Sequence, residues 1–393
     1  MGAISAPTQH SERLSSPDRQ TPPPEPKSQY VIRRIIQAIP VVFLISVVSF
    51  GLMQLAPGGP QAQFNQNPRI SKDAVDKWLQ SWCLERSPDP YGVLREYGGW
   101  LGVWNCDTDS FFSEQGMPNF LPTALGGGTN GVIHGDFGYS ITTGRPVLDM
   151  IVERIPATLI LMGTAFIIWV SLAIVLGVIA AVRRYSMFDQ SVTFFSYVFY
   201  SLPTFWLGLV LIYIFAVTLH WFPSQGIVDA RSAPAAFGTE RYWDAFFEDP
   251  LPQILDIAKH LVLPVVTLVA VSVAADSRFV RSSMLDTLSQ DYVRTARAKG
   301  LPRRTVVFRH AFRNALLPIV TTVALEIAFL FSGAIATETI FSWPGMGRLY
   351  FEGVNNRDYF LLMGILLIGS LLVVIMNLVA DVFYAMADPR IRY

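Results

Sequence analysis

The sequence TLILMGTAFIIWVSLAIVLGVIAAV occupies residues 158–182, contains no charged side chain and is followed directly by Arg183 and Arg184. A helix of about 20 apolar residues crosses the hydrocarbon core of a bilayer. Arginine and lysine residues next to such a helix are retained on the cytosolic side. The stretch therefore predicts a membrane-spanning helix whose carboxyl-terminal end lies in the cytosol.

Five more apolar runs have a comparable length, at residues 35–55, 192–219, 261–280, 315–336 and 360–386. The composition agrees with them, because the 393 residues are 51% hydrophobic and only 15% charged, whereas soluble domains carry about 25% charged residues. The first run is too long for the apolar core of a cleaved signal peptide, so we expect it to remain as an anchor. The predicted fold class is an all-α polytopic membrane protein.

The placement of charge predicts the number of spans. Pro203 interrupts the long run 192–219, which we count as one kinked or tilted helix because the arginine-rich connection 281–313 then lies in the cytosol. Six transmembrane helices with both termini cytosolic are the result. Residues 1–28, rich in proline and polar side chains, are expected to form a disordered cytosolic tail. Residues 56–156 are expected to form a large extracytoplasmic segment.

Several classes of function are disfavoured. The 30 basic residues are balanced by 30 acidic ones, which leaves no excess positive charge for binding nucleic acid. The five histidines are scattered, so no metal site is expected. Cys83 and Cys106 both fall in the predicted extracytoplasmic segment. There they could form one disulfide or remain two free thiols.

The cytosolic connection contains a short segment, DYVRTARAKG at residues 291–300, with helix-ending signals on both sides. Ser289 is a candidate N-cap, and Asp291 and Lys299 complement the helix dipole. Gly300 suits the left-handed position after a helix, and Pro302 the first turn of the next one. A helix this short is marginal in water. We therefore expect it to be held by packing against another surface.

Two interpretations of this helix remain open. Arg294, Arg297 and Lys299 give it a basic rim, which is typical of a solvated loop on the cytosolic side of a membrane. Ala296 and Ala298 are small and would allow another protein to approach closely. The stop signals at both ends favour a docking helix for a cytosolic partner, because an orientation signal needs charge but no defined shape.

The segment resembles the EAA loop of ABC importer permeases, through Thr295-Ala296 and Gly300. Together with RHAFRNALLP at 309–318, it resembles the first (B-type) permease subunit of dipeptide, oligopeptide and nickel importers. Arg294 replaces the acidic residue of many sugar permeases, a change that the peptide branch shares. The other matching motifs are LAPG at 55–58, GDFG at 135–138, SLPTFWLG at 201–208, ETIFSWPG at 338–345, NRDY at 356–359 and DPRIRY at 388–393.

The resemblance implies a type I ABC permease fold over residues 29–393, with a cytosolic coupling loop at 281–314. It also implies three kinds of partner in the bilayer and around it: a second homologous permease, two ATPase subunits and an extracytoplasmic substrate-binding protein. This chain has no phosphate-binding loop, so ATP and Mg would bind to the partners, and no cofactor or catalytic residue is expected here. The residues expected to contact an ATPase are Asp291, Tyr292, Arg294, Thr295, Ala296, Arg297, Ala298, Lys299 and Gly300.

Polar residues inside the predicted spans are a second group of candidates. Glu326 and Asn377 either line the translocation pathway or form structural hydrogen bonds with another span, because polar groups in a membrane usually face the bundle interior. Asp276, Arg278 and Arg281 are expected to pair with one another. On the outer side, the motifs at 135–138 and 343–345 either help to dock the binding protein or fix loop geometry.

Other functions remain as alternatives. A permease for nickel or oligosaccharides would come from the same family. A secondary transporter driven by an ion gradient belongs to a different class, although the sequence has no internal repeat of the kind that such folds commonly show. An intramembrane enzyme would need a nucleophile and a base, or a metal cluster, in its spans.

Overall fold

The computed structural model describes residues 27–55, 92–103, 131–235 and 237–387. The first part of the predicted tail, both cysteines and the carboxyl-terminal motif at 388–393 lie outside this range. So does most of the predicted extracytoplasmic segment. The described residues are mainly helical, and their only β-type pairing is an isolated bridge between Tyr139 and Pro146.

Within these described ranges, four helices are long and apolar enough to cross a membrane: α1 (Lys27–Leu55), α4 (Val147–Val182), α8 (Pro250–Leu288) and α14 (Tyr359–Ala387). They contain the first, second, fourth and sixth apolar runs of the sequence. The α4 and α8 helices begin well before the runs that predict them. The end of the predicted extracytoplasmic segment 56–156 therefore already belongs to α4.

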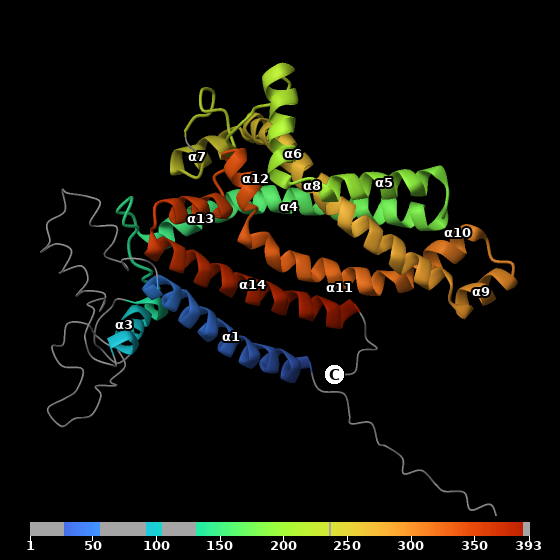
Figure 1. Ribbon diagram of the computed structural model, residues 1–393, viewed down its shortest axis with the longest axis horizontal. Helices are drawn as coiled ribbons and strands as arrows, with labels where there is room; N and C mark the ends of the chain where they lie inside the picture. Colours follow the sequence, from blue (N-terminus) through green and yellow to red (C-terminus); the bar gives the residue numbers. More distant parts are fainter. Residues whose placement is uncertain (1–26, 56–91, 104–130, 236, 388–393) are drawn as a thin grey trace, which may run out of the picture.

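The third run is not one kinked helix but two helices bent by 99°. α5 (Met187–Ser201) ends before Pro203, and α6 (Thr204–Leu211) continues into the π-helical turn η4 (Ile212–Thr218). Leu202 has an extended backbone, because a residue before proline is disfavoured in the helical region. Figure 1 shows α6 standing steeply away from α5.

The fifth run is shorter as a helix than its apolar length predicts. α11 (Arg313–Phe329) passes into a 3₁₀ turn, η6 (Leu330–Ser332), and the chain then turns at Gly333, whose φ is +75°. A Cβ at Gly333 would lie 2.6 Å from the backbone nitrogen of Gly347. Only glycine satisfies both the left-handed conformation and this close approach. The end of the predicted run belongs to α12 (Ile335–Ile340).

Figure 1 shows the long helices running side by side, with short elements at their two ends. α9 (Asp291–Ala298) and α10 (Arg303–Thr305) lie at one end. α3 (Gly92–Leu101), α7 (Glu240–Glu248), α12 and α13 (Met346–Asn355) lie toward the other. The first residues of α1 and the last of α14 point toward the end that carries α9.

Buried apolar clusters join α4 to its neighbours along its length. Near its start, Ile151 packs with residues of α1, α3, α13 and α14. In its middle, Leu161 packs with Val265 of α8 and with Trp343. Near its end, Val178 packs in a cluster that includes α8, α9 and α11. This last cluster connects the long helices to the small elements at the α9 end.

Candidate functional site

The short helix predicted between the fourth and fifth runs is present as α9, Asp291–Ala298. Its amino-terminal cap differs from the prediction. Gln290 occupies the cap position without a side-chain hydrogen bond, whereas the Ser289 hydroxyl donates to the carbonyl oxygen of Asp286 at 2.7 Å. The preceding helix α8 ends in this turn, so the Ser289 hydroxyl serves the end of α8 rather than the start of α9.

The carboxyl-terminal end of α9 has the geometry that the sequence predicts. Gly300 has a φ of +75°. Its N–H donates to the carbonyl of Arg297 at 2.9 Å, and the N–H of Leu301 donates to the carbonyl of Ala296 at 3.4 Å. This pair of bonds is a Schellman motif, which stops a helix sharply. Pro302 then lies just before α10 rather than in its first turn.

One face of α9 is buried within the chain itself. Val293 is fully buried and Ala296 is 5% exposed, and both belong to the apolar cluster of Met284, Val306 and Val307. The packing that such a short helix requires is therefore provided by α8 and by the π-helical segment η5 (Val306–Phe312). Ala296 faces its own chain and is not the point of close approach for a partner.

The opposite face of α9 is solvent-exposed. A partner could contact the following residues of the helix and its carboxyl-terminal end: Asp291, Tyr292, Arg294, Thr295, Arg297, Ala298, Lys299 and Gly300. Beside this face, Arg297 and Arg303 line a hollow of about 370 Å³ whose other walls are aliphatic. The result is a basic surface around a short helix whose other face is fixed to the bundle.

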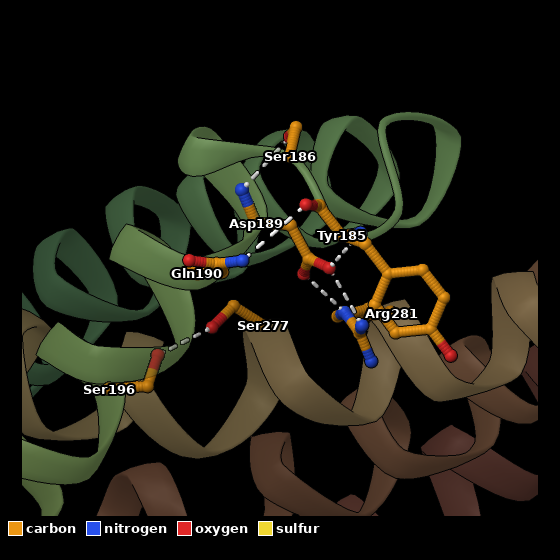
Figure 2. A network of polar contacts seen from close by, with 7 residues as sticks. All are labelled: Tyr185, Ser186, Asp189, Gln190, Ser196, Ser277 and Arg281. Carbon is orange, nitrogen blue, oxygen red and sulfur yellow. Dashed lines mark hydrogen bonds and ion pairs between the residues drawn. The ribbon is translucent and has the colours of Figure 1, made fainter.

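The turn between α4 and α5 is hydrogen-bonded to α8, which precedes α9, and to α10, which follows it. Arg303 donates from Nη2 to the carbonyl oxygen of Val182 at 3.0 Å. Arg281 of α8 donates to both carboxylate oxygens of Asp189, at 2.6 and 2.9 Å (Figure 2). The sequence gives only a local signal for Asp189, a Ser186-x-x-Asp189 pattern in which the Ser186 hydroxyl accepts from the Asp189 N–H at 3.3 Å.

The predicted pairing among Asp276, Arg278 and Arg281 is wrong. Arg281 pairs with Asp189. Arg278 donates to the carbonyl of Ala274 and lies 4.9 Å from the ring centres of two α5 residues, Tyr197 and Tyr200. Asp276 lies two and five positions from the two arginines, and only residues three or four positions apart are neighbours on a helix surface.

Glu326 and Asn377, the polar candidates of the spans, line separate cavities. Glu326 shares a small cavity of about 10 Å³ with Asp276, between α4, α8 and α11. Its Oε2 and the Nε1 of Trp169 are buried without a hydrogen bond among the described residues. Asn377 lines a hollow of about 800 Å³ along α1 and α14. The geometry therefore gives the two residues different surroundings.

The outer motifs come together at the end opposite α9. Trp343 is fully buried and donates from Nε1 to the carbonyl of Ala157 at 2.7 Å. Glu338, also fully buried, accepts hydrogen bonds from the Thr158 hydroxyl and from the N–H groups of Ala334 and Arg348. Burial raises the pKa of the Glu338 carboxyl, and these hydrogen bonds act in the opposite direction.

A second link at this end joins two further motifs. The Ser140 hydroxyl, just beyond the motif at 135–138, donates to the Asp358 carboxylate at 2.5 Å. The other Asp358 oxygen accepts from the N–H of Leu361 in the first turn of α14. The buried positions of Trp343, Glu338 and Asp358 show that these motif residues fix the geometry of the helix ends.

A bundle of long apolar helices that carries a short basic helix at one end defines a multi-pass membrane component. Comparison with known families gives its identity at the family level. Residues 173–393 match the family described as binding-protein-dependent transport system inner membrane component. The chain belongs to this family.

Curated relatives cover nearly the whole chain. The oligopeptide transport system permease protein AppB of Bacillus subtilis is 36% identical over 93% of this chain and 99% of its own length. The di/tripeptide permease DppB of Pseudomonas aeruginosa is 34% identical over 93% and 98%, respectively. The dipeptide permease DppB of Escherichia coli K12 is 32% identical over 93% and 99%.

The chain is therefore a non-enzymatic, multi-pass permease component of an ABC transport system in the inner membrane. The family membership decides between the three classes of protein that the sequence leaves open: an ABC permease, a secondary transporter and an intramembrane enzyme. A secondary transporter and an intramembrane enzyme are both excluded by the family. The sequence interpretation of the motifs as those of an ABC importer permease is confirmed.

Proposed function

We propose that this chain forms half of the translocation pathway of an ATP-driven importer for di- and oligopeptides, and that α9 couples it to an ATPase. The observation that supports this most is the two-sided character of α9. One face is fixed on α8 and η5 by Val293 and Ala296, while the other presents Tyr292 and a basic rim. A force applied to the exposed face reaches the long helices through the buried one.

The substrate class rests on the relatives. The three described above are named as permeases for oligopeptides, di/tripeptides and dipeptides. None of these three is named as a permease for nickel or for an oligosaccharide. Peptides are therefore the substrate that we propose.

The proposed assembly has five parts. A second homologous permease would complete the pathway, and two ATPase subunits would bind ATP and Mg on the cytosolic side. An extracytoplasmic protein would deliver the peptide, in agreement with the family's description as binding-protein-dependent. This chain would bind no nucleotide and no cofactor itself. Its contribution is the membrane path and the exposed face of α9.

The proposed topology has six spans and both termini in the cytosol. The bent pair α5 and α6 with η4 would count as one span. α11 has 17 residues, at the short end of the range of about 17–25 for a transmembrane helix. The direction of α1 and α14 toward the α9 end (Figure 1) and the many arginines there support a cytosolic location for this end.

The proposed cycle follows from the way α9 is packed. Closure of the ATPases on ATP would displace α9. Because α9 shares a buried cluster with the ends of α4, α8 and α11, these helices would move as a group. Rigid-body movement of packed helices alternates access to a central path without unfolding any of them.

Uptake by the reconstituted assembly tests this function. The chain is co-expressed with the second permease, ATPase subunits and binding protein of its importer, and the complex is placed in liposomes with ATP inside. We expect uptake of labelled dialanine or trialanine, unchanged when the proton gradient is collapsed and abolished without ATP. Uptake of labelled maltotriose or nickel in place of both peptides would contradict the substrate class. Uptake that needs a proton gradient but no ATP would contradict the whole proposal.

A further inference from the structure

The Asp189 carboxylate is the centre of the polar network in Figure 2. It is 3% exposed and lies in the first turn of α5. Its two oxygens accept from Nε and Nη2 of Arg281 in α8, 92 residues away, and one of them also accepts from the N–H of Tyr185 at 2.9 Å. Two parallel charge-assisted bonds fix the orientation as well as the distance of the two groups.

The turn held by this carboxylate is itself unusual. Tyr185 has a φ of +64°, a conformation that is uncommon for a non-glycine residue. The hydrogen bond from the Tyr185 N–H to Asp189 and the capping of α5 by Ser186 stabilise it. The path of the chain from α4 into α5 is therefore determined by these polar contacts.

The two arginines that hold this turn come from the two sides of α9. Arg281 lies on α8, which leads into α9, and Arg303 lies on α10, which follows it. Arg281 binds Asp189 after the turn, and Arg303 binds the Val182 carbonyl before it. The helix α9 and the α4–α5 turn are thus joined by two separate hydrogen-bonded links.

Further contacts align α5 along α8 beyond the turn. The Ser196 and Ser277 hydroxyls lie 3.4 Å apart, and Arg278 lies over the rings of Tyr197 and Tyr200. Most of α5 is nevertheless exposed. The links at its first turn add to these contacts in holding α5 against α8.

We infer that Asp189 is a positioning residue that makes α5 follow α9, through Arg281 and in parallel with the Arg303–Val182 link. This inference rests on the proposed coupling function of α9. Displacement of α9 moves α8 and α10. Because Arg281 and Arg303 are hydrogen-bonded to the α4–α5 turn, this turn moves with them. The movement then passes along α5 to its 99° bend at Leu202 and Pro203.

The first test separates coupling from folding. Asp189→Asn keeps the size of the side chain but removes the charge that Arg281 binds. In liposomes with the complete importer, we expect Asp189→Asn to retain its ATPase subunits and ATP hydrolysis, while the peptide transported per ATP falls at least fivefold. The control is Arg184→Gln, which removes an exposed charge of the same turn that stacks on Tyr185 and leaves the two Arg281–Asp189 hydrogen bonds in place.

An unchanged transport-to-ATP ratio in Asp189→Asn would overturn the inference. Equal loss in Arg184→Gln would also overturn it. If the native complex transports neither alanine peptide, the proposed substrate fails. The inference is then decided by spin labels on exposed residues of α5 and α7, at Phe195→Cys and Phe247→Cys. ATP and vanadate should change the distance between these labels in the native background and at most half as much in Asp189→Asn.

A second measurement does not depend on whether Asp189→Asn accumulates. Ser196→Cys and Ser277→Cys, in a background with Cys83→Ser and Cys106→Ser, would allow a disulfide between α5 and α8. If α5 moves together with α8, the oxidised complex should retain at least half of the uptake, or of the spin-label change, of the reduced one. Loss of both on oxidation, with recovery on reduction, would show that the helices must separate and would overturn the inference.

Discussion

Gly177 of α4 lies so close to Ser277 of α8 that a Cβ on the glycine would be 2.7 Å from the Ser277 carbonyl oxygen. The Val280 side chain would be equally near. The two longest helices of the bundle are therefore in contact at the backbone level, one helical turn before Arg281.

This contact gives the first prediction. Gly177→Ala should lower the melting temperature of the purified complex, because overpacking at a close helix contact costs about 1–3 kcal/mol. Gly163→Ala is the matched control in the same helix, since a Cβ there would have no neighbour within 4 Å. Differential scanning fluorimetry in detergent compares the two variants. Equal melting temperatures would show that α4 and α8 are not held at this distance.

The second prediction concerns the end of α9. Gly300→Val should keep the protein in the membrane but reduce the recruitment or stimulation of the ATPase subunits. A β-branched residue disfavours the left-handed conformation by roughly 1–2 kcal/mol, and the helix would be redirected. A Cβ at Gly300 meets no atom within 4 Å, so the effect comes from the backbone alone.

Gly300→Asn is the control for that experiment, because asparagine tolerates the left-handed conformation. It should retain most of the ATP hydrolysis of the native complex. Co-purification and stimulated ATPase activity are measured for both variants. Full activity of Gly300→Val would contradict the role of this turn.

The third prediction concerns Glu338 at the opposite end. Glu338→Gln should destabilise the complex by about 1–3 kcal/mol. In glutamine an NH2 group takes the place of one carboxylate oxygen, so a hydrogen-bond donor would face a buried N–H or hydroxyl donor. Glu352→Gln provides the comparison, since the Glu352 side chain is 37% exposed and contacts Arg348 on the same helix. Thermal unfolding should separate the two variants. An equal response would mean that the Glu338 hydrogen bonds do not hold α12 and α13 in place.

The sequence predicts the long helices and the end of α9 well, because these depend on local information. Long apolar runs produce α1, α4, α8 and α14, and glycine at position 300 permits the left-handed turn. The break at Leu202 and Pro203 also has a local sequence signal, the proline. The angle of 99° between α5 and α6 depends instead on how α6 packs. A proline signal predicts an interruption and not its direction.

The contacts that organise the α9 end could not be predicted in the same way. Asp189 and Arg281 are 92 residues apart, and Arg303 and Val182 are 121 residues apart. No periodicity in the sequence relates them. The interpretation that paired Arg281 with nearby charges failed because the packing of α5 on α8 brings a more distant carboxylate within reach. For the same reason the sequence places Ala296 on a partner surface, whereas the side chain is buried against η5.

The fourth prediction tests the proposed docking face most directly. A photoreactive benzoylphenylalanine replaces Tyr292, which is 43% exposed on α9, or Phe247, which is 78% exposed on α7. Irradiation of whole cells that express the complete importer should crosslink position 292 to an ATPase subunit, and position 247 to none. Crosslinking of an ATPase from position 247, or its absence from position 292 in an assembled complex, would contradict the account that α9 couples this permease to its ATPase.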